Sequence, residues 1–404
     1  MQMIRTSIRR KLFLSAGSGI AALAVPVAAI LSFSVIFGVT QNNKEVENRA
    51  RSYSFENANS NESVLFDPEI TEKNDTVIVE ADEDEEQNVN NMIDFPGKYI
   101  YTVNMNDSSE DLSTFSVHSG KIVNETFGKG NGPEFISLPN GGQLRNCTEI
   151  PTETVNAECS VNSVPEIEMY SDEPQVLILH THTTESYEPY EKDWYDESYT
   201  SRSADPGNGV VAVGEAIAGQ LAAAGINVIH DCTMHDLTYN GAYSRSLGTA
   251  LGVLDRYPTV KVVLDIHRDA IEYEDGTRVS AVTDIDGKRA AQTMIICAAD
   301  DGTYGVPGFM NNLHFASALQ QSMESRYPTL TRPVLFQYCQ YNQQVSPGAL
   351  LIEVGSHGNS IDQAVYSGEL IGKSLAELLK DNCAEAEAVP VAVKMPIYFI
   401  DRVR

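Results

Sequence analysis

The chain has 404 residues, and its 28 Lys and Arg against 56 Asp and Glu give a formal net charge of -28 at neutral pH. This acidity excludes the usual nucleic-acid-binding protein, which needs clustered positive charge, so we expect no nucleic-acid partner. Hydrophobic residues make up 42% of the sequence, which excludes a wholly disordered chain. The six cysteines have no zinc-ribbon spacing and are too sparse for a disulfide scaffold.

The N-terminus has the pattern of a membrane anchor. Residues 1–11 carry four basic residues, and an uncharged run follows from Leu12 to Asn43. Since about 20 apolar residues cross a bilayer, residues 12–39 predict a transmembrane helix, and the basic residues predict a cytoplasmic tail at 1–11. The alternative is a cleaved signal peptide, whose apolar region of roughly 7 to 15 residues is shorter than this one. We expect a single-pass protein whose remaining residues lie outside the membrane.

The next two segments differ in composition. Residues 40–95 contain 15 Asp and Glu but only four Lys and Arg, with few apolar runs, and predict an acidic disordered linker. Residues 96–165 hold short strand-like runs at 98–103, 114–117 and 135–138, separated by Gly-containing turns. These runs predict a small β-rich region.

Residues 166–384 alternate apolar strands with amphipathic helices, which is typical of an α/β fold. The run at 260–266 is apolar almost throughout, as expected for a central parallel strand. We therefore predict a mostly parallel mixed sheet flanked by helices, followed by a C-terminal tail at 385–404. The expected strands are 175–179, 226–229, 260–266, 292–298, 333–338 and 349–354, and the expected helices are 210–224, 241–256, 311–326 and 362–381.

Reactive side chains follow three of the predicted strands. His180 and His182 follow the first strand, His267 follows the strand at 260–266, and Glu353 ends the strand at 349–354. Ligands bind at the carboxyl ends of strands in such sheets, so we expect these side chains to share one rim. Two imidazoles and a carboxylate are the ligands of a catalytic zinc ion, and a further carboxylate would serve as general base.

Each of these residues also has a structural interpretation. A lone histidine at a strand end is usually a hydrogen-bonded structural residue, and Glu353 could simply pair with an arginine. His180 and His182 would share a face if the strand continued, in which case one of them could bind metal while the other supports it. A serine hydrolase built on Ser186, His267 and Asp269 is disfavoured because no GxSxG turn is present.

The chain resembles a known family, the stage II sporulation protein P family of endospore-forming bacteria. The resemblance rests on five segments in order along most of the chain: FISLPNGGQLRNCT (135–148), VLILHTHTTESY (176–187), VVLDIHRDA (262–270), MNNLHFA (310–316) and QYNQQVSPGALLIEVGSHGN (340–359).

The resemblance implies a catalytic domain similar to zinc-dependent N-acetylmuramoyl-L-alanine amidases. It implies that His267 and either His182 or His180 bind zinc, and that Glu353 is the catalytic carboxylate. The amidase pattern His-x-Asn-Ala is met here with Asp269 in place of Asn. The amidases take a Glu ligand from the first helix, where this chain has no early acid, so that role is transferred to Glu185.

The same resemblance implies an activity and a setting. The activity is cleavage of peptidoglycan, by amidase and also endopeptidase action, in septal thinning and forespore engulfment at the cell membrane. The implied partners are stage II sporulation protein D, a lytic transglycosylase, and stage II sporulation protein M. Arg268 and Asn342, from the matching segments, are the candidate substrate contacts. The alternatives are another extracellular metal-dependent deacetylase or peptidase, and a non-catalytic membrane-tethered scaffold.

Overall fold

A computed structural model describes residues 120–196, 198–199, 201–383 and 397–400. The anchor predicted at 12–39, the linker predicted at 40–95 and the strand-like runs at 98–103 and 114–117 lie outside these residues. Among the residues that the structure does describe, no helix is long and apolar enough to cross a membrane.

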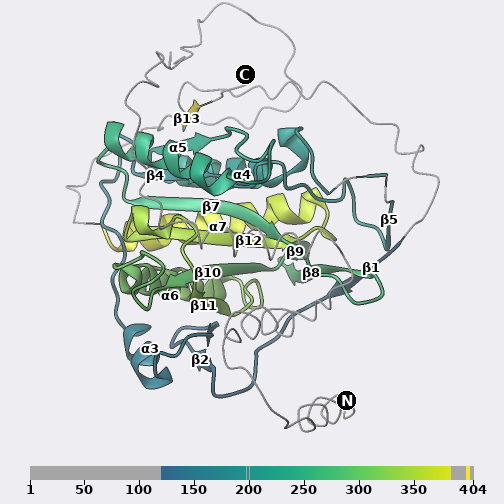
Figure 1. The fold of residues 1–404 in the computed structure, drawn as a ribbon, viewed down its shortest axis with the longest axis horizontal. Helices are drawn as coiled ribbons and strands as arrows, with labels where there is room; N and C mark the ends of the chain where they lie inside the picture. The colour runs from purple at the N-terminus through teal and green to yellow at the C-terminus, as the bar shows by residue number, and fades with distance from the viewer. Residues whose placement is uncertain (1–119, 197, 200, 384–396, 401–404) are drawn as a thin grey trace, which may run out of the picture.

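A mixed sheet of nine strands forms the centre of the described chain (Figure 1). The neighbours from β13 to β12 are all parallel, β10 is antiparallel to β12, β11 and β3 continue parallel to β10, and β2 closes the sheet antiparallel. This confirms the mixed α/β fold expected from the sequence. The order across the sheet is β13 (Ile397–Ile400), β6 (Val228–Asp231), β4 (Val176–Leu179), β7 (Val262–Asp269), β12 (Gly348–Ser356), β10 (Thr293–Ala299), β11 (Val334–Tyr338), β3 (Gln143–Asn146) and β2 (Phe135–Ser137).

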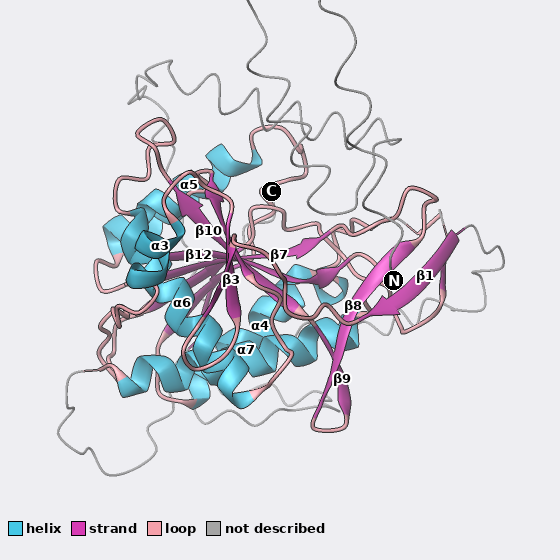
Figure 2. Ribbon diagram, turned by 90° about the horizontal axis from the view of Figure 1, so that it is seen from below, coloured by secondary structure: helices cyan, strands magenta, loops and turns pink. Residues whose placement is uncertain are grey.

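Helices cover both faces of this sheet (Figure 2). The helices α4 (Val210–Ala223), α6 (Phe309–Arg326) and α7 (Ile361–Asp381) lie on one face, and α5 (Ala242–Arg256) lies on the other. The helix α7 begins with a capping box between Ser360 and Gln363, which satisfies two backbone donors at its first turn. Each of these helices begins and ends within about two residues of its predicted range, and differences of this size are usual at helix ends.

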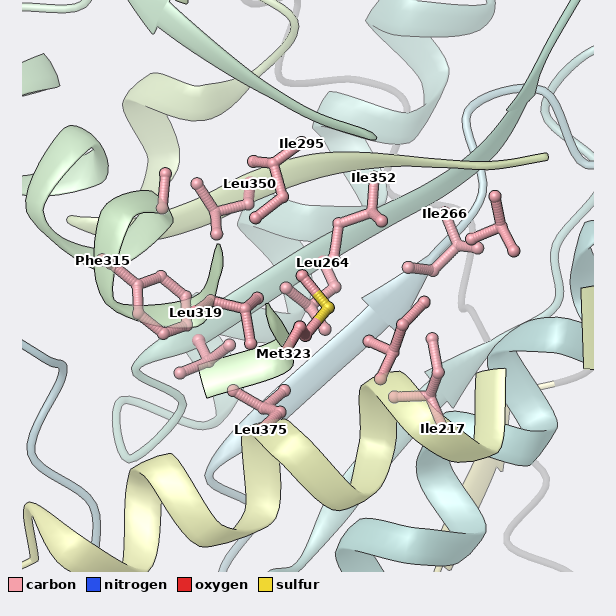
Figure 3. Packing of buried hydrophobic residues seen from close by; sticks show 14 of the residues in the cluster. Ile217, Leu264, Ile266, Ile295, Phe315, Leu319, Met323, Leu350, Ile352 and Leu375 are labelled. Carbon is pink, nitrogen blue, oxygen red and sulfur yellow. The ribbon is translucent and has the colours of Figure 1, made fainter. Parts of the chain in front are cut away.

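The side chains of the central strands alternate between the two faces. Leu264 and Ile266 of β7 and Ile352 of β12 are fully buried against the α4, α6 and α7 face (Figure 3). Val263, one residue earlier than Leu264, packs instead in the cluster under α5. Successive residues of a strand point to opposite faces, so Asp265, His267 and Glu353 point away from the face that carries the core residues of β7 and β12. His267 and Glu353 therefore lie on the α5 face of the sheet.

A second sheet projects beside the carboxyl end of β12 (Figure 2). Its order is β5 (Trp194–Tyr195), β1 (Gly120–Glu125), β8 (Arg278–Ile285) and β9 (Lys288–Ala291). The turn between β8 and β9 has Asp286 and Gly287 at positive φ, as the Asp-Gly signal predicts. The amide of Asn359, just after β12, accepts from Ala281 N at 3.1 Å and donates to Ala281 O at 3.0 Å, which fixes the two sheets to each other.

The strands of residues 120–146 do not form a sheet of their own. The strand β1 pairs with β8 in the second sheet, whereas β3 pairs with β11 and extends the main sheet. The helix α3 (Thr152–Glu158) contacts α6 through Glu158 and His314, whose Oε2 and Nε2 lie 2.6 Å apart. The small β-rich region expected at 96–165 is, over its described part, an extension of both sheets. Within the expected C-terminal tail, residues 397–400 form β13 and pair with β6.

Candidate active site

The strands β4, β7 and β12 bring the candidate residues to one rim of the sheet. His267 and Glu353 are register partners on the parallel strands β7 and β12, so they lie side by side on the same face. Asp265, two residues before His267 on the same strand, lies on this face as well. The apolar residues on the opposite face of β7 fix the direction of these polar side chains. If the strand were turned over, Asp265 and His267 would be buried among the core residues of α4 and α7.

His267 lies between two carboxylates. Its Nε2 is 2.9 Å from Asp265 Oδ1, and its Nδ1 is 3.4 Å from Glu185 Oε2. Burial alone would lower the pKa of His267, but Asp265 and Glu185 together raise it well above its ordinary value. Burial alone would raise the pKa of Glu185, yet hydrogen bonding to His267 and the charge of Arg268 hold it well below its usual range. Without a metal, His267 is an imidazolium paired with both carboxylates.

His182, and not His180, faces His267. The ring centroids of His182 and His267 are 5.3 Å apart, in an edge-to-face arrangement. His180 is fully buried, with Nδ1 3.0 Å from Ile266 O and Nε2 2.9 Å from His230 Nε2. The two histidines would have shared a face only if the strand continued, but β4 ends at Leu179 and the chain turns before His182. His180 continues the strand alternation toward α4.

The packing around His180 explains why α4 carries a glycine at this position. A Cβ atom at Gly214 would lie 2.6 Å from His230 Nε2 and 2.8 Å from His180 Nε2. Burial, followed by the neighbouring His230, lowers the pKa of His180 to about 3. His180 is therefore a neutral side chain between the sheet and α4.

A buried aspartate, Asp236, lies behind His182. Its Oδ2 is 3.8 Å from His182 Nδ1, and its two oxygens accept from the backbone N and the hydroxyl of Thr184. Arg202 Nη1 lies 2.6 Å from Asp236 Oδ2, and Arg202 Nη2 lies 3.6 Å from Glu185 Oε1. Arg202 thus connects the carboxylate behind His182 with the carboxylate beside His267, and orients both.

Aromatic rings line the site beside the two histidines. Tyr239 stacks on His182 with ring centroids 4.8 Å apart, and Tyr243 stacks on His267 at 6.4 Å. The loop that carries Tyr239 is held by Arg245, whose Nε donates to His235 O at 2.6 Å and whose Nη1 donates to Asn240 O at 3.2 Å. These contacts fix the position of the rings relative to the histidines.

Glu353 is the carboxylate of the rim with unused acceptor capacity. Its Oε2 is buried and has no hydrogen-bond partner among the described residues. Burial, followed by the charge of Asp269, raises the pKa of Glu353 to about 8, although His267 acts in the opposite direction. A carboxyl group with a raised pKa and an open oxygen is suited to accept and return a proton near neutral pH.

The residues of the rim fit zinc in donor chemistry and in the spacing of two ligands. Two zinc bonds of about 2.0 to 2.1 Å at a tetrahedral angle separate their ligand atoms by roughly 3.3 to 3.4 Å. His267 Nδ1 and Glu185 Oε2 are 3.4 Å apart, and the imidazole of His182 faces the same space. Asp265 lies 2.9 Å from Nε2 of His267, where a supporting carboxylate lies in zinc enzymes, whereas Asp236 is 3.8 Å from Nδ1 of His182, beyond hydrogen-bond distance. Over the described ranges, no set of three or more His, Cys, Asp or Glu has the full arrangement of a metal site.

The two predicted substrate contacts have protein partners. Arg268 Nε donates to Ser186 O at 2.7 Å, and its Nη1 donates to Asp269 O at 3.3 Å. Asn342 Nδ2 donates to Tyr243 O at 2.9 Å and to Ser246 Oγ at 3.0 Å. Arg268 fixes the loop that carries Glu185, and Asn342 fixes the start of α5. Their contact with substrate stays a prediction.

Several residues of the site were not predicted from the sequence. Asp265 could have been found, because it stands two residues before His267 on the same strand and hence on the same face. Asp236, Arg202 and Tyr239 lie in irregular loops, where no periodicity gives their direction. Their place at the site follows from the long connection between β4 and α4 and from the connection after β6, which fold over the same rim.

The comparison with family models identifies the family. The model of the Stage II sporulation protein P (SpoIIP) family matches residues 37–376. The chain belongs to this family. It is also 25% identical over 306 residues to the Stage II sporulation protein P of Bacillus subtilis (strain 168), an alignment that covers 70% of this chain and 73% of the relative.

Solved structures of peptidoglycan amidases are among the structural matches. N-acetylmuramoyl-L-alanine amidase AmiC2 of Nostoc punctiforme is 10% identical and covers 51% of this chain and 96% of its own, with a TM-score of 0.30. The N-acetylmuramoyl-L-alanine amidase from Clostridium difficile 630 is 15% identical and covers 52% of this chain and 97% of its own, with a TM-score of 0.31. Ami1 from Mycobacterium smegmatis is 10% identical, with coverage of 52% and 100% and a TM-score of 0.31.

Proposed function

We propose that this chain is a zinc-dependent peptidoglycan hydrolase of sporulation, an N-acetylmuramoyl-L-alanine amidase that also cleaves peptide cross-links. The observation that carries the proposal is the pairing of His267 with Glu353 across β7 and β12, next to Glu185 and His182. This arrangement provides imidazole and carboxylate donors on one side and a carboxylate with an open oxygen on the other. Membership of the stage II sporulation protein P family supports the setting.

In this proposal His182, His267 and Glu185 hold the zinc ion. When bound, zinc polarises the substrate carbonyl and lowers the pKa of a bound water to about 7. Binding requires that Nδ1 of His267 give up its proton, which in the absence of metal is shared with Glu185. Asp265 then remains beside Nε2 and orients the ring, and Asp236 lies behind His182 at 3.8 Å from its Nδ1.

Glu353 moves the proton. Its Oε2 accepts a proton from the attacking water and returns it to the nitrogen of the leaving amine, so that the amide bond breaks without releasing an anion of the amine. The positive charge of a cation nearby would lower the raised pKa of Glu353 toward neutrality, where a proton acceptor works best. The rings of Tyr239 and Tyr243 cover the histidines and limit the access of bulk water.

The setting is proposed from the sequence. An anchor at 12–39 and a linker at 40–95 would let a catalytic domain at 166–384 reach wall material outside the cell membrane, at the sporulation septum. Stage II sporulation proteins D and M are the proposed partners, by resemblance of this chain to its family. The described residues bear on neither partner.

The proposal is tested with the full-length chain, His267→Ala and Glu353→Gln. Zinc content is measured by metal analysis, and soluble products from purified peptidoglycan are analysed by mass spectrometry. Glu377→Gln is the matched control for the glutamate, because Glu377 is a half-exposed residue that pairs with Arg326 on the helical face. We expect about one zinc per chain in the wild type, the control and Glu353→Gln, and loss of zinc in His267→Ala.

The wild type and the control should release stem peptides at the same rate, and His267→Ala should release none. The rate with Glu353→Gln should be about 10²- to 10⁴-fold lower, the usual contribution of a positioned general base. A wild type that binds no zinc and leaves the wall intact would exclude this function and favour a scaffold. Zinc binding without release of peptides would instead favour another metal-dependent hydrolase.

A further inference from the structure

A buried arginine outside the predicted motifs lies at the same rim. Arg332 stands just before β11, and its backbone N donates to Thr293 O at 2.7 Å, at the start of β10. Since β10 is antiparallel to β12, with Thr293 opposite Val354, this end of β10 lies beside the carboxyl end of β12. Arg332 is therefore next to the strand end that carries Glu353, and it is only 5% exposed.

The guanidinium of Arg332 uses part of its binding capacity on the protein. Its Nη1 lies 2.8 Å from Asp269 Oδ2, and its Cζ lies 5.8 Å from the ring centroid of Phe127. The other two nitrogens, Nε and Nη2, are both buried and have no hydrogen-bond partner among the described residues. One edge of the guanidinium is thus left open, while Asp269 and Phe127 hold the group in place.

A buried cation with two unsatisfied donors is costly, so this edge calls for an acceptor. The N–H groups on Nε and Nη2 are parallel and form the side-on fork of the guanidinium. Two oxygens held in one plane match this fork with two parallel hydrogen bonds, and a carboxylate has this geometry. A single carbonyl oxygen cannot accept both bonds in line.

We propose that the Nε and Nη2 edge of Arg332 binds a carboxylate of the substrate peptide next to Glu353. The inference rests on the proposed function, because it assigns a specificity site to that same reaction. Asp269 stands where the amidase pattern has Asn, and its charge balances that of Arg332. The charge of Asp269 raises the pKa of Glu353 and that of Arg332 lowers it, so both charges act on the proposed proton acceptor. A peptide anchored at Arg332 has its neighbouring amide close to Glu353.

The test compares two muramoyl peptides that differ only in whether their peptide carboxylates are free or amidated. The full-length wild type, Arg332→Lys and Arg326→Lys are assayed for kcat and KM, and binding is measured by calorimetry in the Glu353→Gln background. Lysine keeps the charge beside Asp269 but lacks the fork. Arg326→Lys is the matched control, since Arg326 is partly exposed on α6 and pairs with Glu377.

We expect the wild type and Arg326→Lys to prefer the free carboxylate by about 10- to 100-fold in kcat/KM, mainly through KM, because the free carboxylate accepts charged hydrogen bonds from Arg332. Arg332→Lys should lose this preference, so that the ratio of its kcat/KM values for the free and the amidated peptide falls to about one. Equal rates of the wild type on both peptides would overturn the carboxylate site, and the Nε and Nη2 edge of Arg332 would then bind only an internal water. An equal loss on both peptides in Arg332→Lys would show that Arg332 only positions Asp269.

Hydrolysis and binding separate this inference from the proposed function. If the wild type cleaves neither peptide but binds the free carboxylate form more tightly through Arg332, the proposed reaction fails and the carboxylate site stands. If it cleaves both peptides equally, the reaction stands and the carboxylate site fails. Neither binding nor cleavage would overturn both.

Discussion

His267 and Glu353 are register partners on the parallel strands β7 and β12, with both side chains on the α5 face of the sheet. The two residues are 86 positions apart in the chain, yet neighbouring strands bring them side by side. The partner of His267 on its other side is Glu185, from the connection that follows β4. Three segments distant in sequence therefore form one site.

Replacing Asp265 should weaken metal binding more than it affects the fold. In Asp265→Asn the contact to Nε2 of His267 loses its charge, while the amide retains an oxygen for Thr181 N, which now lies 2.8 Å from Asp265 Oδ1. We expect zinc affinity to fall by about 10- to 100-fold, as for other carboxylates behind a histidine ligand. Competition with a chromogenic chelator measures this affinity. Asp284→Asn, at an exposed carboxylate of β8, should bind zinc as the wild type does. Equal affinities in all three proteins would contradict the supporting role of Asp265.

Zinc binding should release protons and weaken in acid. Asp265 and Glu185 raise the pKa of His267 well above its usual value, so its imidazole is protonated at neutral pH before the metal binds. A ligand nitrogen must lose this proton before it binds zinc. If one proton is released, the apparent zinc affinity therefore falls by up to about tenfold for each pH unit of acidification. Calorimetry in two buffers with different ionisation enthalpies counts the protons. A binding enthalpy that is independent of the buffer would show that His267 is not a ligand.

A methyl group at position 214 should destabilise the fold. In Gly214→Ala the new Cβ would lie within 2.8 Å of the rings of His180 and His230, which are held between the sheet and α4. We expect the free energy of unfolding, measured by denaturant titration of the full-length chain, to fall by about 1 to 3 kcal/mol.

The matched control is Gly252→Ala in the interior of α5. A Cβ at Gly252 meets nothing within 4 Å, so the substitution should add about 0.5 to 1 kcal/mol through helix propensity alone. The two substitutions are chemically identical and should act in opposite directions. Equal effects would mean that the contact between α4 and the histidine pair is not tight.

His357 should make stability depend on pH in mild acid. Burial, opposed in part by Glu272, lowers the pKa of His357 from 6.5 to about 4. Between these values the unfolded chain binds a proton that the folded chain excludes, so stability is full above pH 6.5 and is lost as the pH falls toward 4. The loss is about 3 kcal/mol. Denaturation of the wild type and His357→Gln across this range isolates the contribution, and parallel curves would exclude it.

The sequence by itself determined the α/β architecture and the strand ends of the site. The apolar run at 260–266 predicted the position of β7 closely, because apolar periodicity reports which face of an element is buried. It also placed His267 and Glu353 near the carboxyl ends of their strands, where parallel strands present ligands, although β7 and β12 continue two and three residues further than these positions. Local patterns suffice for these features, since each depends on a few neighbouring residues.

The choice between His180 and His182 was decided only by the tertiary structure. It depends on where β4 ends and on the turn after Leu179, and the periodicity of a strand no longer applies beyond that point. The same holds for Asp236 and Arg332, which reach the rim from a loop and from the start of β11. Their roles arise from contacts between residues far apart in the chain, and no local pattern encodes the direction of such side chains.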